Sequence, residues 1–108
     1  MTIIKPAAWE VWFANVRFED QPHISKKRPV LVVDNRFVYI LSLKITSQPP
    51  RDNCFGEYQL LKWQEAGLNK PSTVRISKKL KLVEKDFVHK IGRISTIDII
   101  NIRKYLSY

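Results

Sequence analysis

The chain has 108 residues, of which 44% are hydrophobic, and its 19 Lys and Arg against 10 Asp and Glu give a net charge of +9. This length suits one domain with a single core, and no apolar run approaches the roughly 20 residues that a membrane-spanning helix needs. The first residues also lack the apolar stretch of a signal peptide, so we expect one cytoplasmic domain over residues 1–108.

The composition also narrows the possible partners. One cysteine, Cys54, and two histidines show no spacing typical of a metal site, so we expect no cofactor. The positive charge favours a polyanion such as nucleic acid, or an acidic protein. A membrane surface is less suited to this chain, because no basic amphipathic helix is evident.

Hydrophobic alternation and turn residues predict a mainly β chain with a closing helix. We expect strands over residues 10–16, 30–33, 37–47 (the longest), 55–61, 72–77 and 79–83. Residues 17–27 are predicted to form a polar flap, residues 34–35 a tight hairpin, and residues 62–67 a helical turn closed by glycine. Residues 84–90 are ambiguous, with a short helical turn as one interpretation. Ser95 and Asp98 have the spacing of a capping box, which predicts a C-terminal helix. This order suits a small SH3-like barrel of antiparallel strands.

The most informative stretch is Lys27-Arg28-Pro29, which precedes four aliphatic residues typical of a strand buried on both faces. Arg28 is therefore expected at a strand entrance, where a guanidinium can grip a phosphate through two parallel donors. The alternative is a charged strand flank with no further role.

Thr46 lies on the next predicted strand. Arg28 is six residues before Asp34 and Thr46 eleven after Asn35, so the two can meet only if a bulge or overhang absorbs the difference. The pair then predicts either a phosphate site or a strand-end salt bridge beside a threonine that favours β structure.

A wider set of charged and aromatic residues is compatible with RNA binding. The basic members are Lys26, Lys27, Lys44, Arg51, Arg75, Lys78 and Lys79, and the rings are Trp12, Phe18, Phe55 and Tyr58. Such rings can stack on unpaired bases, although core packing explains most of them equally well. His23 lies in the predicted flap, where it could approach a site, whereas His89 is interpreted as a surface residue.

Five motifs in order resemble the MazF/PemK family of toxin ribonucleases, in its PemK-like branch. They are Trp12 with Lys27-Arg28-Pro29-Val30-Leu31-Val32, then Ile45-Thr46-Ser47, Trp63-Gln64-Glu65-Ala66-Gly67-Leu68, Lys70-Pro71-Ser72-Thr73-Val74-Arg75 and Lys90-Ile91-Gly92-Arg93-Ile94-Ser95. The resemblance covers nearly the whole chain.

The resemblance implies an SH3-like barrel, a homodimer, an antitoxin partner with an acidic tail, and metal-independent cleavage of single-stranded RNA. In that chemistry a 2′-hydroxyl attacks the adjacent phosphate. The family's catalytic arginine falls on Arg28 and its catalytic hydroxyl on Thr46. We expect further residues to hold RNA, namely Lys27, Ser47, Lys26, His23, Arg75 and Lys79.

Three departures from the family pattern stand out. Trp9-Glu10 replaces the Gly-Asp or Gly-Glu that commonly opens the first strand, and the flap lacks the usual glycines. No glutamine occupies the later strand where some members add a catalytic side chain, and Lys79 or Arg75 is a possible substitute. Two alternatives to RNA cleavage are a noncatalytic nucleic-acid-binding barrel, for RNA or DNA, and a gyrase-poisoning toxin of the same fold.

Overall fold

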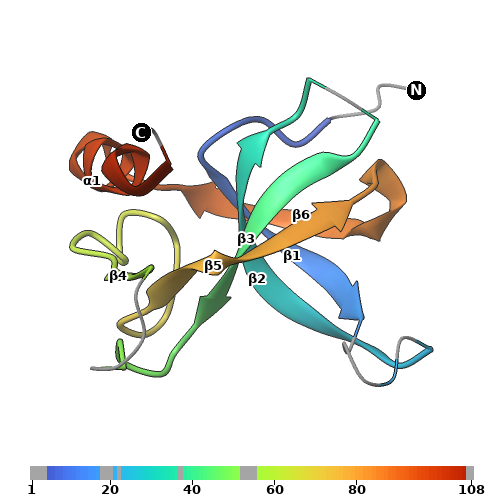
Figure 1. Cartoon of the computed structure of the whole chain (residues 1–108), viewed down its shortest axis with the longest axis horizontal. Helices are drawn as coiled ribbons and strands as arrows, with labels where there is room; N and C mark the ends of the chain where they lie inside the picture. The colour runs from blue at the N-terminus through green and yellow to red at the C-terminus, as the bar shows by residue number, and fades with distance from the viewer. Residues whose placement is uncertain (1–4, 18–20, 22, 37, 52–55, 107–108) are drawn as a thin grey trace.

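The computed structural model describes residues 5–17, 21, 23–36, 38–51 and 56–106, which form one six-stranded antiparallel sheet and a C-terminal helix (Figure 1). The elements are β1 (Glu10–Arg17), β2 (Ser25–Asp34), β3 (Ile40–Thr46), β4 (Glu57–Gln59), β5 (Thr73–Leu82), the 3-10 turn η1 (Glu84–Asp86), β6 (Phe87–Arg93) and α1 (Thr96–Leu106). The strand order is β4-β5-β3-β2-β1-β6. The predicted mainly β class is confirmed. The sheet is strongly curled but open, because no ladder joins β4 to β6 in the described part of the chain.

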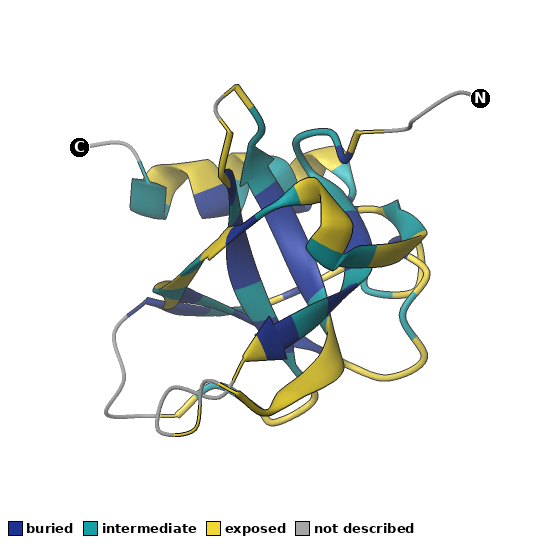
Figure 2. Cartoon of the chain, turned by 90° about the vertical axis from the view of Figure 1, so that its right-hand side faces the viewer, coloured by how far each residue is buried: buried dark blue, intermediate teal, exposed yellow. Residues whose placement is uncertain are grey.

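The two faces of the sheet bury two separate apolar clusters. Val11, Leu31, Leu43 and Ile45 belong to the larger cluster, which also contains Ile102 of α1. The smaller cluster lies inside the curl of the sheet and contains Trp12, Ala14, Val16, Val30, Val32, Ile40 and Leu82. Successive residues of β2 therefore alternate between the two clusters and are buried in a row, whereas the first four residues of this strand are exposed. Figure 2 shows the buried residues gathered toward the middle of the sheet. Residues 30–33 contribute to both clusters, which confirms that this run is buried on both faces.

The C-terminal helix and the turn before β5 follow the sequence prediction closely. Asp98 N–H donates to Ser95 Oγ at 3.4 Å, so Ser95 caps α1 as expected. Gly67 closes the turn at residues 62–67 with φ of 89°, a conformation that favours glycine. Trp63 in that turn packs against the larger cluster. Among the described residues, no helix is long and apolar enough to span a membrane.

Strand boundaries differ from the prediction at the basic stretch. β2 begins at Ser25, so residues 25–27 lie within a strand and not in the predicted flap, and Arg28 lies inside the strand and not at its entrance. The reason is backbone pairing: β1 extends to Arg17, which pairs with Ser25, and ladder hydrogen bonds do not depend on side-chain polarity. Arg28 is therefore an internal strand residue opposite Ala14. The rest of the predicted flap lies mostly outside the described residues.

Three further predictions were wrong. β3 has 7 residues, against 10 in both β2 and β5, so it is not the longest strand. No tight turn occurs at residues 34–35, because the connection runs to residue 39 and Asn35 Nδ2 donates to Pro6 O at 2.8 Å. The two strands expected at residues 72–77 and 79–83 are one strand, β5, with an irregularity between its pairings to Leu43 and Lys44. The chain past η1 forms β6, which the ambiguous sequence at residues 84–90 did not reveal.

Candidate functional site

Arg28 and Thr46 face the same side of the sheet on neighbouring strands. The β2–β3 ladder includes Val30 opposite Lys44, and the same register continued by two residues brings Arg28 opposite Thr46. Paired residues share a face, and so do residues two apart on a strand. The irregularity between Val32 and Asp34 absorbs part of the length difference between the two arms of the hairpin. The sequence had required either a bulge or an overhang here.

β5 adds a second guanidinium to this face. Arg75 pairs with Lys44, and Thr73 pairs with Thr46, so Arg75 is the diagonal neighbour of Thr46 across the strand pair. Diagonal neighbours in a sheet are about 7–8 Å apart, within the reach of a long side chain. We call the surface formed by Arg28, Lys44, Thr46 and Arg75 the cationic face.

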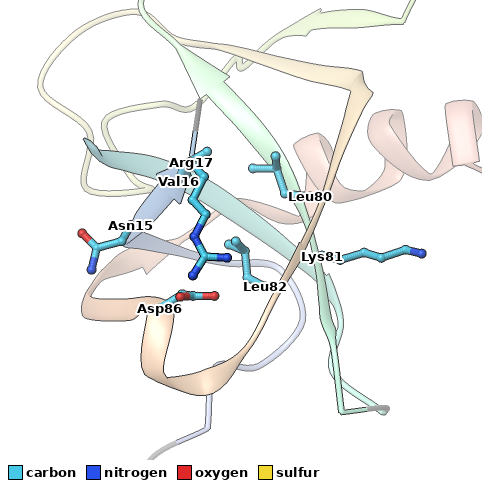
Figure 3. A pocket seen from close by; sticks show the side chains of 7 residues that line it. All are labelled: Asn15, Val16, Arg17, Leu80, Lys81, Leu82 and Asp86. Atoms are coloured by element: carbon cyan, nitrogen blue, oxygen red, sulfur yellow. The ribbon is translucent and has the colours of Figure 1, made fainter. Parts of the chain in front are cut away.

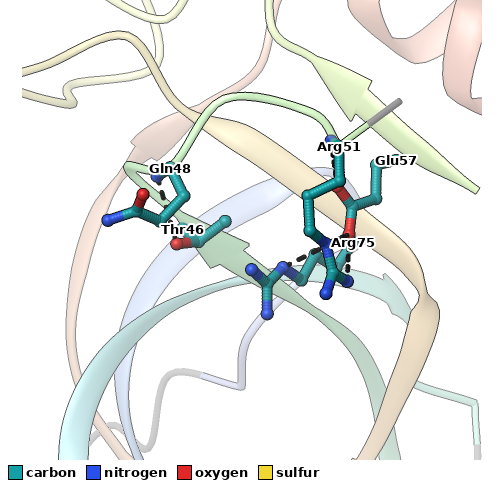
Figure 4. A network of polar contacts seen from close by, with 5 residues as sticks. All are labelled: Thr46, Gln48, Arg51, Glu57 and Arg75. Atoms are coloured by element: carbon teal, nitrogen blue, oxygen red, sulfur yellow. Dashed lines mark hydrogen bonds and ion pairs between the residues drawn. The ribbon is translucent and has the colours of Figure 1, made fainter. Parts of the chain in front are cut away.

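Glu57 of β4 is the carboxylate beside the cationic face. It pairs with Arg75 in the β4–β5 ladder, and its side chain is only 1% exposed. Arg51 donates to it through the backbone N–H at 2.9 Å, Nε at 3.1 Å and Nη2 at 2.6 Å. Arg75 Nε lies 3.6 Å from Glu57 Oε2, so the carboxylate lies between two guanidinium groups (Figure 4).

The charge of Glu57 is stabilised by these neighbours. The side-chain and backbone hydrogen bonds from Arg51 lower the pKa of Glu57 below its ordinary value, and the charge of Arg75 lowers it further. Glu57 is therefore an anion at neutral pH. With its oxygens accepting from Arg51, it is poorly suited to act as a general base, which needs a pKa near the working pH.

The two residues expected to be catalytic are available to a ligand. Arg28 is exposed, and its side chain makes no hydrogen bond or ion pair with the residues that the structure describes. Thr46 Oγ1 accepts a hydrogen bond from Gln48 N–H at 3.2 Å, which leaves its own proton free to be donated. A guanidinium and a hydroxyl donor on one face can bind the oxygens of a phosphate.

The other residues expected to hold RNA are distributed over both faces. Lys26 precedes Arg28 by two residues and shares its face. Lys27 and Lys79 pair with Asn15 and Leu43, so they lie on the opposite face from Arg28 and Arg75. Ser47 follows β3 directly and is exposed.

Histidine and aromatic side chains contribute little to the cationic face. His23 is exposed just before β2, and His89 packs against Phe13 with ring centroids 4.9 Å apart. Trp12 is buried edge-on against Phe87, and the Tyr58 hydroxyl donates to Asp98. Both rings belong to the packed interior, and the other two candidate stacking rings, Phe18 and Phe55, lie outside the described residues.

Sequence reasoning missed the role of Glu57. The sequence around an acidic residue in a short strand does not show which residues it contacts. Glu57 meets Arg75 because of the β4–β5 register, and it meets Arg51 because the segment before β4 folds back beside this strand. Arg51 had been grouped only as a basic residue, and Arg75 had been expected to hold RNA or to substitute for a catalytic side chain, without a link to Glu57. Their shared contact with one buried carboxylate is what gives Arg75 a defined place beside Thr46.

A small hollow of about 150 Å³ lies near the ends of β1 and β5 (Figure 3). Val16, Leu80 and Leu82 form its apolar wall, and Arg17 and Asp86 lie at its polar side. The Lys81 side chain points away from these residues (Figure 3). The hollow therefore offers a mixed polar and apolar surface rather than a second cluster of cations. No group of His, Cys, Asp and Glu suited to hold a metal ion occurs among the described residues.

Comparison with known proteins decides the family. A family model described as PemK-like, MazF-like toxin of type II toxin-antitoxin system matches residues 7–108. The chain belongs to this family of toxins. Its resemblance to the MazF/PemK family is thus confirmed, and membership implies that an antitoxin is its partner. A sequence comparison with curated proteins found no match.

Solved structures share the fold of this MazF-like toxin. An endoribonuclease from a mycobacterial species superposes with a TM-score of 0.72 at 12% identity, over 99% of this chain and 92% of the other. The Mycobacterium tuberculosis toxin MazF-mt6 superposes with a TM-score of 0.65 at 19% identity, over 88% and 89% of the two chains. At these identities the comparison establishes a common fold.

Proposed function

We propose that this MazF-like toxin is an endoribonuclease that cleaves single-stranded RNA without a metal ion. The observation that supports this most directly is the β2–β3 register, which directs Arg28 and Thr46 to one face of the sheet. Family membership and the endoribonuclease among the similar structures support the same activity. Substrate and toxin would meet in the cytoplasm.

The proposed reaction needs charge stabilisation above all. A ribose 2′-oxygen attacks the adjacent phosphorus, the bond to the 5′-oxygen breaks, and the products end in a 2′,3′-cyclic phosphate and a 5′-hydroxyl. Negative charge builds on the phosphoryl oxygens during attack. Arg28 stabilises this charge with two N–H donors, and the Thr46 hydroxyl donates to a phosphoryl oxygen. Arginine stays protonated in proteins, so Arg28 acts by electrostatic stabilisation and hydrogen bonding.

Other residues in the proposal bind the RNA chain, or the antitoxin that competes with RNA for the same surface. Lys26 extends the cationic face along β2, and Arg75 extends it across β5, while Ser47 and His23 contact RNA at its borders. Lys27 and Lys79 lie on the opposite face of the sheet and are left out of this RNA-binding surface. The net charge of +9 also suits an antitoxin with an acidic tail that covers this face. We further propose that the toxin is a homodimer, which light scattering of the purified protein would test.

Incubation of the protein with mixed-sequence RNA in EDTA tests the proposed activity. The expected products carry cyclic phosphate ends. Arg28→Ala and Thr46→Ala should each reduce cleavage at least 100-fold, in line with the loss of one donor to a developing charge. Arg36→Ala is the matched control, because Arg36 is an exposed arginine paired with Asp34 at 2.9 Å at the other end of β2. It should leave cleavage unchanged.

Each alternative function gives a different result in the same assay. A noncatalytic nucleic-acid-binding barrel would bind RNA in a salt-sensitive manner and release no product. A gyrase-poisoning toxin would leave the RNA intact and inhibit gyrase through a protein interface. Full activity of Arg28→Ala or of Thr46→Ala would reject the proposed catalytic roles.

A further inference from the structure

Val38 and Tyr39, the two residues before β3, expose large apolar side chains next to each other. Val38 is 82% exposed and Tyr39 is 58% exposed. Tyr39 and Leu41 line a hollow of about 290 Å³, whose other walls are Asp34 and Lys81. Ligand pockets usually measure roughly 300–1,000 Å³, so this hollow has room for a side chain of a partner and is small for a cofactor. Adjacent exposed apolar residues are typical of an interaction surface.

A second hollow adjoins the first. Val38 lines it together with Lys5, Val83, Glu84 and Lys85, over about 500 Å³. Because residues 38 and 39 are consecutive, the two hollows lie side by side, at the end of the sheet where the last residue of β5 pairs with the first residue of β3. An extended segment of a partner can therefore place one apolar side chain in each hollow.

Lysine side chains surround these two hollows. None of them forms an ion pair or a side-chain hydrogen bond with a residue that the structure describes. Asp34 is paired with Arg36 at 2.9 Å, so it does little to offset the positive charge, and Glu84 is the other carboxylate of the two linings. We call Val38, Tyr39, Leu41 and these lysines the outer site. The lysines are Lys5, Lys79, Lys81 and Lys85.

The outer site lies on the other face of the sheet from the cationic face. Lys79 pairs with Leu43 of the larger apolar cluster, whereas the cationic face shares its side of the sheet with Val30 of the smaller cluster. The two sites also lie at opposite ends of β3, because Tyr39 directly precedes this strand and Thr46 ends it, about 20 Å further along. A ligand at the outer site therefore leaves the cationic face open.

Charge and shape together favour one kind of partner. The lysines disfavour a second copy of this chain, which would bring another net charge of +9 to the same surface. RNA carries a phosphate at every nucleotide, whereas this surface combines its lysines with apolar walls and with Glu84. An acidic protein segment fits better, because it can place carboxylates opposite the lysines and apolar side chains in the hollows.

We propose that the outer site is a second binding site for the antitoxin, and that it binds an acidic segment anchored by apolar side chains. Membership of the toxin family provides this partner. A segment held at the outer site keeps the rest of the antitoxin close to the toxin, which raises the effective concentration of the acidic tail at the cationic face. The inference does not depend on RNA cleavage by the toxin.

Binding of the purified cognate antitoxin to toxin variants tests the outer site. In isothermal titration calorimetry, Tyr39→Ala should raise the Kd about tenfold, because it removes an aromatic anchor. Lys81→Glu should also raise the Kd about tenfold, because it places like charges opposite each other. Lys62→Glu makes the same change of charge at an exposed position near the other end of β5, where Leu60 N–H donates to Ser72 O. This control should change the Kd by less than about threefold.

Charge exchange tests whether the contact is direct. Each Asp and Glu of the antitoxin is replaced by lysine in turn, and one replacement should restore the affinity for Lys81→Glu toxin to within about threefold of the wild-type pair. Tyr39 and Lys81 are both exposed, so their variants should keep the wild-type midpoint of urea unfolding. An unchanged Kd for Tyr39→Ala or for Lys81→Glu would overturn the proposal.

Two further measurements identify the occupant if it is not the antitoxin. Weaker binding of Tyr39→Ala to a noncleavable RNA, with 2′-deoxyribose at the cleavage position, would assign the outer site to RNA. Loss of self-association in Lys81→Glu, measured by light scattering, would assign it to a second copy of the chain. Either result would overturn the antitoxin assignment.

The cleavage assay separates this inference from the proposed function. Free Tyr39→Ala toxin should cleave mixed-sequence RNA in EDTA as fast as wild type, whereas its inhibition should need about tenfold more antitoxin, in line with the raised Kd. If the wild-type protein releases no product, the proposed ribonuclease function is wrong, and the Kd values still decide the outer site. If cleavage occurs and the Kd values do not change, only the inference about the outer site is overturned.

Discussion

Asp98, in the first turn of α1, accepts a hydrogen bond from the Tyr58 hydroxyl of β4 at 2.6 Å. Its carboxylate is buried and also accepts from the backbone N–H groups of Leu61 and Lys62, at 2.9 and 3.0 Å. One side chain therefore joins α1, β4 and the segment that follows β4. Because Glu57 precedes Tyr58 directly, this junction also holds the strand that carries Glu57.

Replacement of Asp98 by alanine should strongly destabilise the protein. Asp98→Ala leaves two backbone N–H groups and the Tyr58 hydroxyl without their acceptor, and should lower the free energy of unfolding by about 3 kcal/mol. Urea unfolding followed by circular dichroism measures this change. Asn101→Ala removes only the 2.9 Å hydrogen bond from Asn101 Nδ2 to the Tyr58 oxygen, and should lower the free energy of unfolding by about 1 kcal/mol. Similar losses for both variants would show that Asp98 is not the main junction.

The raised pKa of the Tyr58 hydroxyl predicts that the folded protein loses stability at alkaline pH. Burial and the hydrogen bond to Asp98 raise the pKa of Tyr58 from 10 to about 12. The folded state holds the phenolic proton more tightly than the unfolded chain, so this stabilisation is complete below pH 10 and is lost as pH rises from about 10 to 12. Urea midpoints measured between pH 9 and 12 should fall less steeply for Tyr58→Phe than for wild type. Tyr39→Phe, at an exposed ring, is the control and should keep the wild-type slope.

The fold was predictable where side-chain pattern alone decides the structure. The alternation of residues 10–16, the aliphatic run at residues 30–33 and the capping box at Ser95 each fix a local element, and all three appear in the structure. Strand boundaries that depend on backbone pairing with another strand were harder to predict from the sequence. Residues 25–27 are polar and were predicted to belong to a loop, yet β1 provides a partner strand for them. β6 likewise forms because β1 offers its other edge.

The site was predictable only as separate residues. Arg28 and Thr46 were candidates for a phosphate site, their catalytic roles came from the family resemblance, and the sequence could state only that a bulge or an overhang was needed to bring them together. Their common face follows from the register, which depends on the irregularity near Val32. Glu57 and Arg75 could not be connected in advance, since their pairing arises from a strand of three residues, β4.

Salt dependence should reveal which lysines contact phosphates. Each contact to a single-stranded phosphate contributes about −0.7 to the slope of log K against log salt concentration. Lys26 shares the face of Arg28, so Lys26→Ala should make this slope about 0.7 units less negative for a 2′-deoxy oligonucleotide. Lys85→Ala, in η1 beyond the far end of β5, should leave the slope unchanged. Fluorescence anisotropy at several salt concentrations measures both, and equal slopes for Lys26→Ala and wild type would remove Lys26 from the RNA-binding surface.

The backbone conformation of Trp9 predicts that glycine is more stable than alanine at this position, the reverse of the usual order. Its φ of 71° lies in the left-handed region, where glycine is favoured. Two hydrogen bonds maintain this backbone conformation, from Trp9 N–H to Val32 O at 2.7 Å and from Ile94 N–H to Trp9 O at 3.0 Å. The indole ring packs against the larger apolar cluster, which compensates for the backbone strain.

Comparison of two variants separates the ring from the backbone. Trp9→Ala and Trp9→Gly both lose the ring contacts, but only Trp9→Ala retains the steric clash of a Cβ at positive φ. Trp9→Gly should therefore be more stable than Trp9→Ala by about 1 kcal/mol in urea unfolding. At the neighbouring position, where φ is not positive, Ala8→Gly should be destabilising. If Trp9→Ala proved as stable as Trp9→Gly, backbone strain at Trp9 would not contribute to stability, and the ring contacts alone would account for this residue.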